Sequence, residues 1–241
     1  MWRSVEDESL DLEDRQKRMP NTFTYNTIIK SWGDLREAKR ADSLLRELKD
    51  IELEGKYPLN PNTDTYALVI SAWTKHEVGE RKSKAGVGLE TAFQLLQDMI
   101  KREEEGRSDI FTDIDIFNNV LKCAAESPLC SIRVYNVAVK TFYLLDCSRN
   151  TPDHFSYQYL LQAGIKVLST QRDKSQLDYF LKVAIKRCCD NGQLSRGVLQ
   201  VISGFANILE ETMDWPPPKS CSRNISDPKF LPVHPDVAMG E

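Results

Sequence analysis

Apolar residues recur at the spacing of one helix face in four stretches of this 241-residue chain. In each stretch an aromatic residue is followed by apolar or small residues three, four and seven positions later. This spacing places the four side chains on one side of an α-helix. The aromatic residues that head the stretches are Tyr25, Tyr66, Phe117 and Tyr157, separated by 41, 51 and 40 residues. The pattern predicts four α-helices, each with an aromatic side chain in the core.

The same spacing returns in a second stretch after each predicted helix. The second stretches start at Ala41, Ala92, Ala138 and Leu177, so three of the four begin with a small residue. Small residues let two helices approach closely, which favours a helix pair in each unit. Helix pairs repeated at a period of this length predict an all-α fold, an α-solenoid of helix-turn-helix repeats in which each unit contacts its neighbours.

The predicted repeat region covers residues 20–190, and its units differ mainly in the lengths of their loops. The four units are residues 22–62, 63–113, 114–153 and 154–192. Residues 1–19 are expected to supply a partial or capping helix, and residues 193–214 a C-terminal capping helix. The proline-containing segment 215–241 is expected to be an irregular tail. The longest insertion, residues 77–88, is polar and contains glycine, which predicts an exposed and mobile loop.

Composition argues against several classes of function. Apolar residues make up 41% of the chain and charged residues 28%, and the net charge of −4 argues against a nucleic-acid binder that uses its whole surface. No run of about 18 apolar residues is present, so no membrane partner is expected. The six cysteines form no CxxC pair and the three histidines are scattered, so neither a metal site nor a cofactor is expected. Glycine-rich phosphate loops and HExxH or GxSxG motifs are missing, and we expect no enzymatic activity.

Four motifs carry a resemblance to a known repeat family. They are PNTFTYNTIIKSW from Pro20, PNTDTYALVISAW from Pro61, TDIDIFNNVLKCA from Thr112 and PDHFSYQYLLQAG from Pro152. Together with second helices of the AxxLLxxM type, these motifs resemble the pentatricopeptide repeat (PPR) family over residues 20–190. The tetratricopeptide repeat, by contrast, requires a Trp-x-x-Leu-Gly-x-x-Tyr start that this chain lacks.

The resemblance implies a right-handed superhelix that binds single-stranded RNA in a mitochondrion or plastid and acts in RNA processing, stability or translation. In this family each repeat faces one base, which two or three side chains read. The N-terminal segment of this chain is acidic, whereas transit peptides are rich in arginine and poor in acidic residues. No targeting segment is therefore visible: either the chain needs none, or its natural start lies upstream.

The resemblance also implies which residues would read bases. In this family the residue after the aromatic and the last residue of the unit have that role. The implied pairs are Asn26 with Asn62, Ala67 with Asp113, and Asn118 with Asp153, whereas Gln158 has no evident partner. An asparagine amide offers both a donor and an acceptor to a pyrimidine edge. The resemblance thus implies uridine opposite Asn118, a pyrimidine opposite Asn26 and no readable base at Ala67. Local capping is the ordinary explanation for asparagine in a first helical turn.

The family also holds each base between apolar side chains two places before the aromatic. Phe23 and Phe155 suit this stacking role. Asp64 and Asp115 do not, because a carboxylate repels phosphate and offers no flat face. The resemblance therefore implies base stacking at the first and fourth units alone.

Two lysines lie where the resemblance implies contact with phosphate, Lys75 and Lys166. Asp34 and Glu126 occupy the matching places in the other units, so only half of the implied groove suits RNA. An alternative therefore stays open. In that alternative the chain is a helical-repeat protein-interaction scaffold, or a structural subunit of a larger assembly such as a ribonucleoprotein, with little direct RNA contact.

Overall fold

The computed structural model describes residues 20–55, 57–82, 84–171 and 174–204. Within these residues all regular secondary structure is α-helical, which confirms the all-α class. The helices are α2 (Thr22–Asp34), α3 (Ala38–Glu54), α4 (Thr63–Gly79), α5 (Val87–Glu104), α6 (Ile114–Glu126), α7 (Ile132–Cys147), α8 (His154–Leu168), α9 (Ser175–Asp190) and α10 (Arg196–Ser203). None of these described helices is long and apolar enough to cross a membrane.

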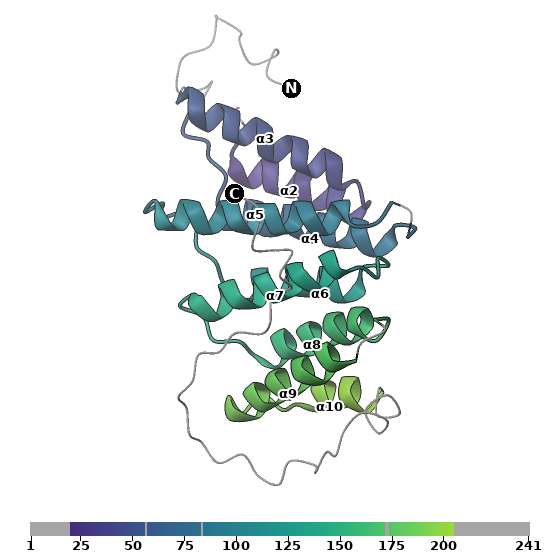
Figure 1. Cartoon of the computed structure of the whole chain (residues 1–241). Helices are drawn as coiled ribbons and strands as arrows, with labels where there is room; N and C mark the ends of the chain where they lie inside the picture. Colours follow the sequence, from purple (N-terminus) through teal and green to yellow (C-terminus); the bar gives the residue numbers. More distant parts are fainter. Residues whose placement is uncertain (1–19, 56, 83, 172–173, 205–241) are drawn as a thin grey trace, which may run out of the picture.

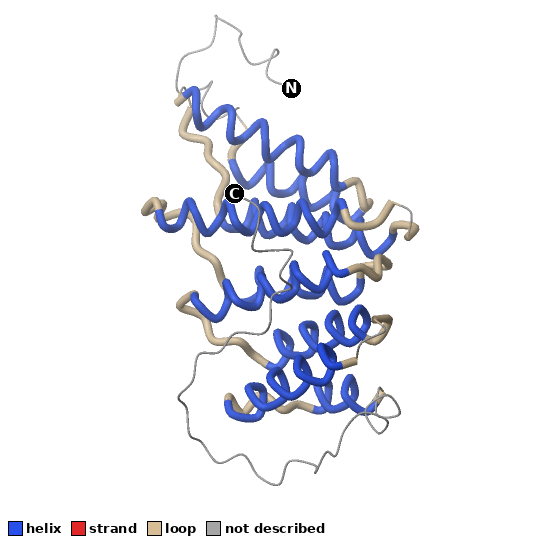
Figure 2. The backbone as a smooth tube through the Cα atoms, viewed as in Figure 1, coloured by secondary structure: helices blue, strands red, loops and turns tan. Residues whose placement is uncertain are grey.

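The helices form two rows (Figure 1). We call α2, α4, α6, α8 and α10 the first helices, and each contacts the next along the row. We call α3, α5, α7 and α9 the second helices, and each packs on the first helix that precedes it. The turns within a pair lie along one edge of the molecule and the linkers between pairs along the other (Figure 2). The start of each first helix therefore lies beside the start of the next.

The aromatic residues near the starts of first helices α2, α4, α6 and α8 are buried, as predicted. Tyr25 is 3% exposed, and Tyr66, Phe117 and Tyr157 are fully buried. Removing a large apolar side chain from water contributes roughly 1.5–3 kcal/mol to folding. The buried phenols keep polar partners, since Tyr66 donates a hydrogen bond to Asp98 on α5 (2.5 Å). Tyr25 likewise donates to Glu47 on α3, and Tyr157 accepts from Asn191 at the end of α9, so the three tyrosines tie their first helices to the second helices that follow.

The fourth helix pair achieves close approach through a different residue from the others. Ala41, Ala92 and Ala138 are buried on the second helices of the first three pairs. In the fourth pair the small residue lies on the first helix, because a Cβ atom on Gly164 would come within 2.3 Å of the Phe180 ring. The space that the glycine leaves is filled by this buried ring, so the pair packs closely although Leu177, and not an alanine, heads the apolar face of α9.

The prediction of an exposed, mobile loop over residues 77–88 is wrong at both of its ends. α4 continues to Gly79, and the Glu77 side chain is fully buried. Its carboxylate accepts hydrogen bonds from the backbone N–H groups of Gly86 (2.7 Å) and Gly88 (3.0 Å) and from the Ser127 hydroxyl (2.5 Å). A buried carboxylate needs such donors. Through them Glu77 of α4 holds the start of α5, which carries the two glycines, and the turn between α6 and α7, which carries Ser127. Only the middle of the segment is exposed.

Some predicted segments lie partly or wholly outside the described residues. Residues 1–19 and 215–241 lie wholly outside them, and of the predicted capping helix 193–214 only α10 and its approach are described. α10 packs on α8, with Val198 fully buried. The division of the chain into four repeats stays a prediction.

Candidate nucleic-acid interface

The first predicted reading pair is hydrogen-bonded where α2 meets α4. Asn26 Nδ2 donates to Asn62 Oδ1 at 3.3 Å, and the Thr65 hydroxyl lies 2.8 Å from Asn26 Oδ1. Asn62 is also the N-cap of α4, because its Oδ1 accepts the backbone N–H of Thr65 at 3.0 Å. The predicted pair is therefore part of a three-residue cycle that includes the helix cap. We call Asn26, Asn62 and Thr65 the first triad.

The cap determines which way the Asn26 amide points. A backbone N–H can only donate, so the oxygen of Asn62 must face Thr65. That oxygen then requires the NH2 group of Asn26 opposite it, which turns the oxygen of Asn26 toward the Thr65 hydroxyl. One N–H and one lone pair of the Asn26 amide remain for a ligand. The helix cap thus presents a donor and an acceptor in a fixed order.

A second triad lies where α6 meets α8. Asn118 Nδ2 donates to Asp153 Oδ1 at 3.2 Å, and the Ser156 hydroxyl donates to Asn118 Oδ1 at 2.7 Å. Asp153 caps α8 by accepting the backbone N–H of Ser156 at 2.9 Å. Ser156 is fully buried and Asn118 is 8% exposed, so this triad is more enclosed than the first. We call Asn118, Asp153 and Ser156 the second triad.

We call the place where one first helix meets the start of the next a joint. The joint between α4 and α6 has a helix cap, as the two joints with a triad do, but it lacks the other two side chains of a triad. Asp113 accepts the backbone N–H of Ile116 at 2.9 Å and so caps α6. Ile116 is apolar, and Ala67 stands where the other joints have asparagine. This joint therefore has a capped helix and no oriented amide. That the second unit has no readable base stays a prediction.

The structure supplies a neighbour for Gln158 that sequence reasoning missed. Ser195 is the N-cap of α10, because its hydroxyl accepts the backbone N–H of Val198 at 3.3 Å. It therefore caps the first helix that follows α8, just as Asp153 caps the first helix that follows α6. The Gln158 amide lies against α10, because a Cβ atom on Gly197 would be 2.3 Å from its oxygen. The sequence did hold a signal for this cap, because Ser195 lies three residues before Val198, the first apolar residue of α10.

The predicted stacking residues lie in the first turns of α2 and α8. Phe23 is 78% exposed and Phe155 is 46% exposed. The Phe155 ring is stacked on Tyr159 of the same helix, with centroids 6.3 Å apart. Asp64 and Asp115 are exposed at the matching places of α4 and α6. Aromatic side chains are therefore exposed in the first turns of α2 and α8, and carboxylates are exposed in the first turns of α4 and α6.

The first of the two predicted phosphate-binding lysines is paired with a carboxylate. Lys75 Nζ lies 2.7 Å from Asp34 Oδ1, joining the ends of α4 and α2. The hydrogen bond and charge of Lys75 lower the pKa of Asp34, with a smaller contribution from Lys30. This ion pair is solvent-exposed, and such pairs are weak. Lys75 can therefore exchange its carboxylate partner for a phosphate at little cost.

The second predicted lysine caps a helix. Lys166 Nζ donates to the backbone carbonyls of Ala124 (3.0 Å), Ala125 (3.0 Å) and Ser127 (2.8 Å) at the end of α6. An ammonium group has three N–H donors, and all three are used here. Burial lowers the pKa of Lys166. A phosphate contact by this lysine would require it to release at least one carbonyl.

Comparison with known proteins adds no family to this geometry. No protein-family model and no curated protein matches the sequence.

Proposed function

We propose that this chain is a pentatricopeptide-like α-solenoid with a right-handed superhelical path, and that it binds single-stranded RNA along its first helices. The two triads are the observation that carries the proposal. Each holds an asparagine amide in one orientation with a donor and an acceptor left over, which suits the edge of a base. The resemblance adds that Asn118 with Asp153 reads uridine and that Asn26 with Asn62 reads a pyrimidine.

The exposed aromatic side chains support the same function. Phe23 and Phe155 precede the reading positions by three residues, in the first turns of α2 and α8. Stacking on an aromatic ring contributes about 1–3 kcal/mol per base and tolerates any base. On α2 a stacking ring, Phe23, and an oriented amide, Asn26, lie on the same helix, and together they suit holding a base and selecting it. A role in organellar RNA processing, stability or translation, in a mitochondrion or plastid, goes with the resemblance.

Titration with a pyrimidine-rich and a purine-rich RNA at moderate salt tests the proposal. The wild-type chain should prefer the pyrimidine-rich strand, and Asn118→Ala should lose about 1–3 kcal/mol of discrimination at one nucleotide. Asn136→Ala is a matched control, because it makes the same chemical change on second helix α7, outside both triads. Uniform weakening across all sequences in Asn118→Ala would contradict a reading role.

The scaffold alternative rests on the acidic side chains along the same surface. Asp64 and Asp115 are exposed on α4 and α6, and Lys166 is committed to the carbonyls of α6. These features suit a protein partner with a basic surface better than they suit phosphate. Failure to bind either RNA at concentrations well above the non-specific range would favour this alternative over RNA recognition.

A further inference from the structure

Six cations lie in the two turns that close the first two helix pairs or in the first turn of α3, which follows the first of them. We call Arg36, Lys39, Arg40, Arg81, Lys82 and Lys84 the basic edge, and all six are exposed. The two carboxylates in these turns already have partners: Glu37 lies 3.7 Å from Arg40, and Glu80 lies 3.6 Å from His76. Among the described residues no ion pair engages the other five cations. The basic edge therefore carries positive charge that the protein itself leaves uncompensated.

On the opposite edge, where the linkers between pairs lie, three arginines are ion-paired. Arg102 pairs with Glu52 at 2.7 Å, Arg107 pairs with Asp109 at 3.1 Å, and Arg149 pairs with Glu103. The third within-pair turn, residues 127–131, carries no charged residue at all. Among the described residues, the basic edge thus carries five cations without an ion pair, whereas these three arginines of the linker edge are all paired.

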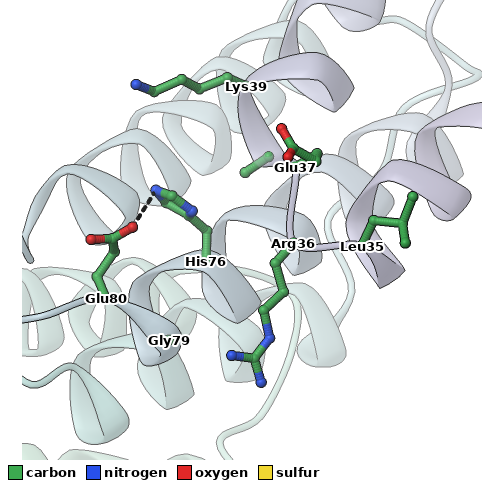
Figure 3. Close-up of a pocket in the computed structure, with 8 residues that line it drawn as sticks. Leu35, Arg36, Glu37, Lys39, His76, Gly79 and Glu80 are labelled. Carbon is green, nitrogen blue, oxygen red and sulfur yellow. Dashed lines mark ion pairs between the residues drawn. The ribbon is translucent and has the colours of Figure 1, made fainter.

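A recess of about 440 Å³ lies between the α2–α3 turn and the end of α4 (Figure 3). Arg36 and Lys39 come from one side of it, and on the other side His76 comes from α4 and Glu80 from the residue that follows this helix. The recess separates the charges of the first turn from the α4–α5 loop that follows Glu80. A ligand that carries several negative charges in a row can therefore lie across both turns and contact cations from each.

We propose that the basic edge binds the phosphate backbone of the RNA whose bases the triads read, a proposal that rests on the proposed function. Two further lysines precede these turns on the first helices, Lys30 on α2 and Lys75 on α4, and Lys75 is paired with Asp34. α4 has 17 residues and is therefore about 25 Å long, and its triad and the basic edge lie at its opposite ends. The backbone contact is thus separate from base reading, and involves a part of the strand beyond the read bases.

Two other polyanionic partners fit the basic edge less well. An anionic membrane surface is usually bound by an amphipathic helix with several Trp, Phe or Leu residues on its apolar face, and of these residue types residues 35–40 and 80–87 contain a single one, the exposed Leu35. Protein–protein interfaces are depleted in lysine, and three of the six cations are lysines. Phosphodiester contacts, by contrast, need exposed cations and no particular apolar partner.

Salt-dependent binding of a labelled oligouridylate RNA, long enough to overrun the four helix pairs, tests this inference. The test variant is Arg81→Gln/Lys82→Gln/Lys84→Gln, whose three side chains are exposed in the loop. The control variant is Arg133→Gln/Lys140→Gln/Lys186→Gln, which removes three exposed cations from the second helices α7 and α9. Both variants lower the net charge by three from −4, so they differ only in where the charge is removed.

We expect the loop variant to reduce the slope of log affinity against log salt by about 2, since each contacted phosphate of a single strand contributes about 0.7. The control should keep the wild-type slope, and both variants should keep the preference for uridine over adenosine. Equal slopes in the two variants, with uridine preference intact, would overturn the basic edge and leave the proposed function standing. A slope difference without base preference would instead remove the reading function. Binding of the wild type to phosphatidylserine vesicles that RNA does not displace would assign the edge to a membrane.

Discussion

Two joints stack one first helix on the next with different side chains: the joint between α6 and α8, and the joint between α4 and α6. At both joints an aspartate caps the incoming helix with a hydrogen bond of 2.9 Å to a backbone N–H. The α6–α8 joint adds Asn118 and Ser156, whereas the α4–α6 joint has Ala67 and Ile116 in their places. The helices stack at both joints, so the polar network is not required for the fold. A feature that the fold does not require is a reasonable candidate for recognition.

The largest expected difference between the joints comes from removing their caps. Asp153→Ala should lower the free energy of unfolding by about 2–4 kcal/mol, because it removes a cap worth about 1 kcal/mol and leaves the Asn118 amide without its acceptor. Asp113→Ala should cost only about 1 kcal/mol, because no side chain depends on it. Urea unfolding of the two variants measures both values. Equal losses would mean that the second triad adds nothing to its cap.

Removing the hydroxyl of the second triad should have a smaller effect. Ser156→Ala leaves the oxygen of Asn118 without its donor and should cost about 1–2 kcal/mol. It should also shift the side-chain NH2 resonances of Asn118, which report the orientation of the amide, and Ser156→Thr should restore them. Ile116→Val is the control in the other joint, with a cost of about 0.5–1.5 kcal/mol from lost burial and no such shift. An unshifted Asn118 amide in Ser156→Ala would show that the hydroxyl does not orient it.

A third triad can be built into the α4–α6 joint. Ala67→Asn combined with Ile116→Thr would add the amide and the hydroxyl beside the existing cap, Asp113. We expect the two substitutions to couple favourably by about 0.5–1.5 kcal/mol in a double-mutant cycle, because each supplies the partner of the other. Under the proposed function, the double variant should also gain a preference at one further base. Strict additivity of the two single changes, in stability and in base preference, would contradict this view of the joint.

The smallest expected effect concerns the far end of the α2–α4 joint, where Lys75 meets Asp34. Lys75 lowers the pKa of Asp34 from its ordinary value of 3.8, so the pair stabilises the fold above that pH and loses its contribution as the pH falls through the lowered pKa. Lys75→Gln should return the pKa toward 3.8, as followed by NMR titration of the Asp34 carboxyl. Lys30→Gln should move it less, because its effect is purely coulombic and smaller. A larger shift in Lys30→Gln than in Lys75→Gln would contradict the pairing.

The sequence predicted the helices well because helix formation here depends on local periodicity. The spacing after Tyr25, Tyr66, Phe117 and Tyr157 specifies one apolar face, and burial of these aromatic side chains follows from it. The resemblance also selected Asn26 with Asn62 and Asn118 with Asp153, which are hydrogen-bonded in the structure. Their role in reading RNA stays a prediction.

Other features could not be predicted because they depend on contacts between distant segments. Ser195 lies 37 residues after Gln158, and only the packing of α10 on α8 brings the two helices together. Lys166 looked available for phosphate, but the end of α6 supplies three carbonyls within reach of its ammonium group. Glu77 looked like the start of an exposed loop, yet the start of α5 folds back to satisfy its carboxylate.

The sequence by itself therefore determined the helical class, the buried aromatic positions and the identity of the polar residues at each joint. These properties depend on spacing along one helix, which the order of residues specifies directly. Only the tertiary structure decided which donors and acceptors those polar residues use up among themselves and which they leave over. It also separated the paired cations of one edge from the unpaired cations of the other. The physical reason is that a hydrogen bond or an ion pair needs its partner within about 3–4 Å, and that partner can lie tens of residues away in the chain.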